Sequence, residues 1–151
     1  MNFKIIAFTI FSLLIFSCGN NKKAIEQSTT DAEKLVEQQK AVIGKIPKNY
    51  KKTTINSARV NGHLLHLNVS YSGGCEDQTF ELIGSSTIMK SYPAKRPVAL
   101  IRDDKDDTCR EWITVDLTFE IKALADQQKE GNTIVLLLDN YEEDISYTFS
   151  E

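Results

Sequence analysis

Hydrophobic and polar residues alternate along much of the chain after residue 50, with the period of two that is typical of β-strands. In the longest example, five apolar residues are separated by single polar residues: Ile113, Val115, Leu117, Phe119 and Ile121. Successive side chains of a strand point to opposite faces, so this pattern predicts one buried and one solvated face. Similar alternation or short apolar runs occur at residues 65–71, 80–82, 98–101, 134–138 and 145–149.

The segments around these runs complete the prediction of a β-sandwich. Asn61-Gly62 lies between two strand-like runs and is typical of a type I′ hairpin turn. Residues 134–138 are apolar throughout, which indicates a strand covered on both faces, whereas residues 123–131 indicate a short helical turn or crossover loop. About seven strands in roughly 100 residues predict an all-β fold, a single antiparallel β-sandwich of the Ig-like type. A small barrel is the alternative.

The segment before the strands has a different composition. Residues 19–48 are rich in Asn, Lys, Gln and Glu. A start signal at Asp31 and a broken apolar stripe predict one weakly amphipathic helix over about residues 31–43. We interpret this segment as a tether that lifts a domain off a membrane, with a partner-binding helix as the alternative. The expected organisation is therefore a signal segment over residues 1–17, a tether over 18–48 and a β-sandwich over 49–151.

The first eighteen residues resemble a bacterial lipoprotein signal. Lys4 precedes an apolar run, Ile5 to Phe16, which is shorter than the roughly 20 residues of a transmembrane helix, and Ser17 precedes Cys18. The resemblance implies cleavage before Cys18 and lipid attachment to it; secretion without a lipid is the alternative. Two or more acyl chains anchor a protein stably. Gly19 favours the outer membrane, so we expect an outer-membrane lipoprotein of the cell envelope that faces the periplasm or the surface.

The charge of the chain argues against nucleic acid as a partner. The net charge is −3, and removal of Lys4 with the signal would make it one unit more negative. Proteins that bind nucleic acid use a surplus of Lys and Arg to neutralise phosphates. The expected compartment points the same way, so we expect a membrane and an envelope component as partners, and no nucleic acid.

Two of the three cysteines are expected to form a disulfide. If Cys18 carries the lipid, Cys75 and Cys109 remain. Two thiols outside the cytoplasm usually pair, and these two lack the CxxC spacing or nearby histidine of a metal or nucleophilic pair, which is the alternative. Closing this loop of 35 residues would stabilise the fold by about 3.8 kcal/mol in the chain-entropy model.

The densest acidic segment, residues 103–107, is a weak candidate for a Ca²⁺ site. Asp104 and Asp106 have the alternate spacing with which carboxylates surround this ion. However, Cys109 stands where an EF-hand loop has glycine, and Val115 stands where it has glutamate. A solvated loop before a strand, in which Asp favours turns, is the alternative.

Three aromatic residues are candidates for a binding surface for a glycan or a peptide. These residues are Trp112, Tyr92 and Tyr141, of which Trp112 has the parity of the polar face of its strand. An exposed Trp often marks a site of interaction. The alternative for Trp112 is packing beneath the 123–131 segment or against the tether helix.

No residue pattern indicates catalysis. His63 and His66 are three apart on a predicted strand, so they point to opposite faces and do not form a metal pair. The sequence lacks P-loop, HExxH, GxGxxG and GxSxG motifs. We therefore expect no enzyme activity and no cofactor, and keep a glycan hydrolase with paired carboxylates as a remote alternative.

Residues 69–82 and 103–119, taken as a pair, resemble the C-terminal β-sandwich of NigD-like lipoproteins from Bacteroidota. The shared features are a strand, glycines, Cys75 and a Phe-Glu-Leu run, then an acidic loop, Cys109 and a long alternating strand. The resemblance covers roughly residues 50–150 and implies a sandwich fold. Members usually carry an additional N-terminal β-domain, where this chain has the 18–48 segment. The family name comes from a proposed role in bacteriocin immunity.

These observations predict a lipid-anchored, non-catalytic binding or accessory module whose ligand is an unknown envelope protein or glycan. An immunity or inhibitor protein against a secreted toxin or hydrolase is the main alternative.

Overall fold

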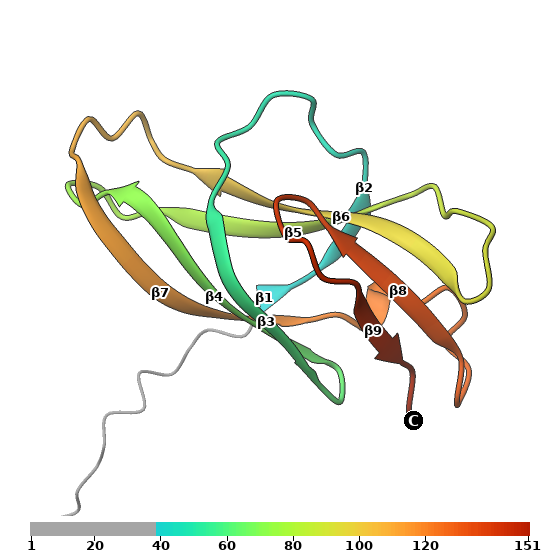
Figure 1. Cartoon of the computed structure of the whole chain (residues 1–151). Coiled ribbons are helices and arrows are strands. Elements are labelled where there is room, and N and C mark those ends of the chain that lie inside the picture. Colours follow the sequence, from blue (N-terminus) through green and yellow to red (C-terminus); the bar gives the residue numbers. More distant parts are fainter. Residues whose placement is uncertain (1–38) are drawn as a thin grey trace, which may run out of the picture. The chain divides into compact units, whose positions relative to one another are not determined.

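The computed structural model describes residues 39–151, which form two β-sheets packed face to face (Figure 1). One sheet has the strand order β1-β7-β4-β3, and the other has the order β2-β5-β6-β8-β9. The strands are β1 (Gln39–Lys40), β2 (Val42–Gly44), β3 (Thr54–Asn61), β4 (Leu64–Gly73), β5 (Thr79–Ser85), β6 (Ala94–Asp103), β7 (Glu111–Glu120), β8 (Thr133–Leu138) and β9 (Ile145–Thr148). The predicted all-β sandwich is thus confirmed, and its seven expected strands are β3 to β9.

The sheets are mixed, whereas the sequence predicted purely antiparallel pairing. The hairpins β3–β4, β5–β6 and β8–β9 are antiparallel, and so is the β4–β7 pair. β6 and β8 are parallel because the chain crosses to the other sheet as β7 and returns in its original direction. Strands β1 and β2 also pair in parallel, with β7 and β5.

The helix predicted over residues 31–43 is wrong for residues 39–43, which form the two short strands β1 and β2 with Ala41 between them. β1 pairs with the end of β7 in one sheet, and three residues later β2 pairs with the end of β5 in the other. Ala41 lies between them and is only 4% exposed. Strand edges offer unpaired backbone groups, and Val42 and Ile43 are β-branched, so pairing outweighs a weak helical pattern. Residues 31–38, the signal and Cys18 lie outside the described residues.

The core consists of the inward-facing residues of both sheets. Leu65, Leu67 and Val69 of β4 are at most 1% exposed, as the alternation predicted. The apolar run in β8 lies between β6 and β9, and Val135, on its outer side, is also buried. The predicted turn after β7 is a 3₁₀ helix, η1 (Lys122–Leu124), whose Leu124 enters the core. No helix within residues 39–151 is long and apolar enough to cross a membrane.

The buried side chain of Arg96 links β6 to η1. Its guanidinium donates hydrogen bonds to the carbonyl oxygens of Leu124, Ala125 and Ser85, at 2.9, 3.3 and 2.5 Å. Burial lowers the pKa of Arg96. Because each of its three nitrogens donates to a carbonyl group, this charged side chain is accommodated at 5% exposure.

The β3–β4 hairpin differs from the prediction in its turn type. Asn61 still pairs with Leu64, so the two central residues are Gly62 and His63. Gly62 has a φ of +56°, but neither Asn61 nor His63 has a positive φ. A type I′ turn needs positive φ at both central residues, whereas type II′ needs it only at the first, which suits glycine.

Candidate functional site

A segment of nine residues between β2 and β3 crosses the five-stranded sheet and forms one wall of a pocket. This crossing segment, residues 45–53, arches over the sheet in Figure 1. It is held at its end, where Lys51 pairs with Arg102 of β6 and the side-chain amide of Asn140 donates to the carbonyl oxygen of Thr53 at 2.8 Å. Ala99 has outward parity in β6 and is nevertheless fully buried, which shows that the outer face of this sheet is covered here.

The pocket has a volume of about 570 Å³, within the usual range for sites that bind small molecules or short segments. Its floor is apolar and comes from β6 and β8, with Pro97, Ala99 and Leu137. Its rim is polar and comes from the crossing segment and the β8–β9 loop. The rim residues are Lys48, Tyr50, Lys52, Asp139, Asn140, Glu143 and Asp144.

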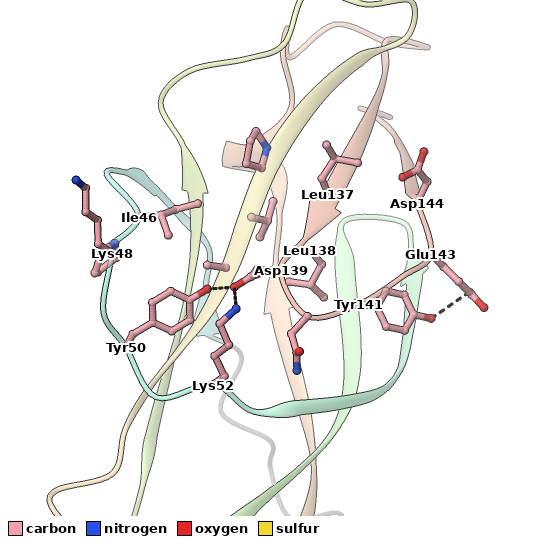
Figure 2. Close-up of a pocket in the computed structure, with 15 residues that line it drawn as sticks. Ile46, Lys48, Tyr50, Lys52, Leu137, Leu138, Asp139, Tyr141, Glu143 and Asp144 are labelled. Carbon is pink, nitrogen blue, oxygen red and sulfur yellow. Dashed lines mark hydrogen bonds and ion pairs between the residues drawn. The ribbon is translucent and has the colours of Figure 1, made fainter.

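Two residues of the crossing segment converge on one carboxylate of the β8–β9 loop (Figure 2). The hydroxyl of Tyr50 donates a hydrogen bond to Oδ2 of Asp139, and Nζ of Lys52 lies 2.9 Å from the same oxygen. Further along the rim, the hydroxyl of Tyr141 donates to Glu143 at 3.1 Å. Asn140 has a φ of +65°, a conformation that Asn tolerates better than most residues, and this turns the loop back toward the crossing segment.

These contacts move the two acid–base groups away from neutral pH. Burial, together with the hydrogen bond to Asp139 and its charge, raises the pKa of Tyr50. The hydrogen bond from Tyr50 and the ammonium group of Lys52 lower the pKa of Asp139. Tyr50 therefore stays protonated and Asp139 stays ionised. A general acid or base works best with a pKa near the operating pH, so the cluster is suited to holding a ligand by fixed charges and hydrogen bonds.

The predicted disulfide between Cys75 and Cys109 is present, with a Cα–Cα distance of 5.8 Å. Asp107 organises the two loops that it joins. Oδ2 of Asp107 accepts hydrogen bonds from the backbone N–H groups of Gly74, Cys75 and Glu76 at 2.8, 3.1 and 3.2 Å, and Oδ1 accepts one from Cys109 at 2.8 Å. These donors, Cys109 first, lower the pKa of Asp107 to about 2.

Within residues 39–151, Asp104 and Asp106 belong to no group of three potential metal ligands. Asp104 forms an ion pair with Lys51 at 3.1 Å, which lowers the pKa of Asp104. Within residues 39–151, the potential metal ligands that converge are Cys75, Asp107 and Cys109. Two of these are paired in the disulfide and are not thiolates, so this group lacks the donors of a metal site. The acidic segment instead forms a loop stabilised by its own Asp side chains.

The three candidate aromatic residues lie in separate places. Trp112 pairs with Ser72 near the disulfide and is 64% exposed, so it does not pack beneath the 123–131 segment. Tyr92 is fully exposed in the β5–β6 loop, at the opposite end of the sandwich (Figure 1). Tyr141 packs against the core at the rim of the pocket. They form no common platform, and only Tyr141 belongs to the pocket.

The two histidines also lie apart, as expected from their parity. Nδ1 of His63 is 2.7 Å from the hydroxyl of the buried Tyr147, and its ring packs against Phe149. His66 is exposed on the other face and lies 3.0 Å from Oγ1 of Thr118. Both side chains are explained by packing and hydrogen bonding within the sandwich.

The pocket could not be predicted from the sequence, because Ile46 to Lys48 belong to the expected tether and no pattern marks Tyr50 or Lys52 in the expected sandwich. The local signal is short: β-branched Val42-Ile43, then Ile46-Pro47 and Tyr50, in a segment that is otherwise polar. Tyr50 and Asp139 are 89 residues apart, so no local pattern connects them.

Comparisons with known proteins identify solved structures that have a similar fold. No protein-family model matches the sequence, and no curated protein matches it. Among solved structures, a NigD-like immunity protein from Bacteroides caccae is similar with a TM-score of 0.54 and 12% identity, over 73% of this chain and 58% of that one. A protein of unknown function, DUF1344, from Bacteroides vulgatus is similar with a TM-score of 0.50 and 15% identity, over 76% of this chain and 57% of that one.

This chain thus spans less than two thirds of the length of both structures. At these identities the likeness concerns the fold alone. The residues described here therefore have the β-sandwich fold of a NigD-like immunity protein, as the resemblance in the two cysteine-containing segments implied.

Proposed function

We propose that the protein is a lipid-anchored envelope lipoprotein whose sandwich binds another envelope component without catalysing a reaction. The observation that carries this proposal is the cluster of Tyr50, Lys52 and Asp139 at the rim of an apolar floor. It offers fixed charges and hydrogen-bonding groups around an apolar surface. Its pKa shifts are opposite to those that proton transfer at neutral pH requires.

The pocket suits a segment that has both an apolar and a polar side. The floor of Pro97, Ala99 and Leu137 would bury apolar groups, while the rim carries both signs of charge. A short protein loop or a glycan unit of the envelope has this combination.

The expected anchor agrees with an accessory role. Cys18 precedes the first described strand by 21 residues, and a fully extended segment of that length reaches roughly 70 Å. A lipid on Cys18 would hold the sandwich at the outer membrane and leave it within reach of partners in the envelope.

The test is crosslinking in intact cells followed by capture through a tag at Glu151. We expect one envelope protein or glycan to be enriched with the unaltered protein and lost with Asp139→Asn. Lys122→Ala, an exposed change on η1, serves as the matched control and should keep the partner. Recovery of only bulk envelope material, or equal capture by all three proteins, would count against the proposal.

An immunity function is the second candidate, and the fold similarity to the NigD-like immunity protein favours it. It requires that the bound partner be a secreted toxin or hydrolase. We expect deletion of the gene to sensitise cells to the products of neighbouring strains, and the unaltered gene to restore resistance. Unchanged sensitivity across a panel of such strains would refute this candidate and leave the binding proposal standing.

A further inference from the structure

One long strand edge is paired for only a small part of its length. β7 pairs with β4 over all ten of its residues, from Glu111 to Glu120. On its other side, within residues 39–151, only Phe119 and Glu120 have partners, in β1. Within residues 39–151, no strand therefore pairs with this side of β7 from residue 111 to residue 117. The facing edge of β5 is similar, because β2 pairs with Ile83, Gly84 and Ser85 and not with residues 79–82.

The register shows which backbone groups this edge offers. The backbone N–H of Ala41 donates to the carbonyl oxygen of Glu120 at 2.9 Å, so the polar backbone groups of Glu120 point toward the β1 side. The backbone N–H of Ile121 donates to His63, toward β4. Because these directions alternate along a strand, the N–H and C=O groups of Trp112, Thr114 and Asp116 point toward the unpaired side.

A cleft with apolar walls lies between these parts of β7 and β5, which have no strand partner on this side within residues 39–151. Its volume is about 790 Å³, and both sheets contribute apolar side chains, which are Tyr71, Phe80, Ile113, Val115 and Leu117. Four of these five are only partly buried, although Ile113, Val115 and Leu117 have the inward parity of the core. An unpaired edge next to incompletely covered apolar side chains is the arrangement to which an added strand binds.

The carboxylates that line the cleft favour a basic partner. Its lining includes Glu76, Asp77 and Asp116, and no Lys or Arg. The chain's own residues 31–38 carry three acidic residues and one lysine, so they do not complement this rim. A strand that alternates apolar residues with Lys or Arg would place the apolar side chains in the cleft and the cations near the carboxylates.

We infer that the edge of β7 from residue 111 to 117 binds an extended, basic segment of a partner protein as an additional strand. Backbone hydrogen bonds to Trp112, Thr114 and Asp116 hold this segment, and its apolar side chains complete the core. This surface is separate from the Tyr50–Asp139 pocket, so the inference extends the proposed binding function and does not depend on the pocket.

The experiment uses the full-length protein and a short capped peptide that alternates lysine and valine. Trp112 is the sole tryptophan, so its fluorescence reports on the edge directly. We expect the peptide to change this fluorescence and to shift the amide resonances of Trp112, Thr114 and Asp116. A peptide that alternates glutamate and valine should bind at least about tenfold more weakly, because its charge matches that of the rim.

Two matched variants separate the backbone from the side chain. Thr114→Pro removes the outward N–H without removing a hydrogen bond to β4, and it should weaken binding by about tenfold. Both variants lose the hydroxyl of Thr114, but Thr114→Ala keeps the backbone N–H, so it should bind the peptide as the unaltered protein does. Asp77→Lys should also weaken binding, and it gives an independent measurement if Thr114→Pro does not fold. Asp139→Asn, in the pocket, should leave peptide binding unchanged.

Equal binding of Thr114→Pro and Thr114→Ala, or of the two peptides, would overturn the inference. Strong protection of the Thr114 and Asp116 amides from hydrogen exchange, in the full chain without peptide, would also overturn it. The chain itself would then occupy the edge.

Discussion

The side of the sandwich that carries β1 and β2 has two halves, which differ in how the edges of β7 and β5 are paired. In the first, the closed half, β1 and β2 pair with the ends of β7 and β5, and Ala41 passes between the sheets. In the second, the open half, the edges of β7 and β5 have no strand partner within residues 39–151, and the Cys75–Cys109 disulfide and Asp107 hold the loops together. Phe119 and Ile121 are at most 1% exposed in the closed half, whereas Ile113 and Val115 remain partly exposed in the open half.

This difference separates two sources of order in one small domain. Pairing of five residues of the N-terminal segment seals the core in the closed half. In the open half, covalent and charged contacts fix the loops and leave part of the core accessible. This division fits the binding function proposed above, because the proposed strand-binding edge lies in the open half while strand pairing stabilises the closed half.

The largest expected effect compares the same substitution in the two halves. Ile121→Ala removes a fully buried side chain and should lower the free energy of unfolding by about 3–4 kcal/mol. Ile113→Ala should cost only about 1 kcal/mol, because its side chain is partly exposed. Urea unfolding of both variants measures the difference. Equal losses would mean that the open half is as well sealed as the closed one.

Loss of the disulfide comes next. Replacing both Cys75 and Cys109 with Ala should cost up to about 3.8 kcal/mol, because the unfolded chain regains the entropy of the 35-residue loop. Hydrogen exchange should then rise first in residues 74–78 and 104–110 and remain slow in β4. A uniform rise across both sheets would show that the disulfide supports the whole domain and not the open half.

The third prediction concerns pH and Asp107. Its pKa is about 2 in the folded state, below the unfolded value of about 3.9. A depressed pKa stabilises the fold above the unfolded value, and this contribution is lost as pH falls from about 4 to 2. Asp107→Asn should lower the melting temperature at pH 7 and flatten its pH dependence between pH 4 and 2. An unchanged profile would assign the acid sensitivity to other carboxylates.

The smallest effect is expected for the ion pair between Lys40 and Glu120 in the closed half. Their charged groups are 3.7 Å apart, and the side chain of Lys40 is 78% exposed. Solvent and salt screen such a pair, so Lys40→Ala should change the free energy of unfolding by less than about 0.5 kcal/mol. A larger loss, measured by urea unfolding, would show that charge helps to hold β1 against β7.

The sequence by itself determined the class of fold and the seven strands β3 to β9. The alternation at 65–71 and 113–121 depends only on which face of a strand is buried, so it can be read without knowing the partner strand. The disulfide could also be predicted from the sequence, because only two cysteines remained once Cys18 was assigned to the lipid.

Only the tertiary structure decided how the polar residues are brought together and how the strand edges are closed. The Val42-Ile43 pair is too short a β-branched run to predict strands, and β1 and β2 form because β7 and β5 supply backbone partners. Tyr50 meets Asp139, and Asp107 meets Gly74, across 89 and 33 residues. Such contacts depend on which segments the packing of the two sheets places side by side, and periodicity within a single segment carries no information about that choice.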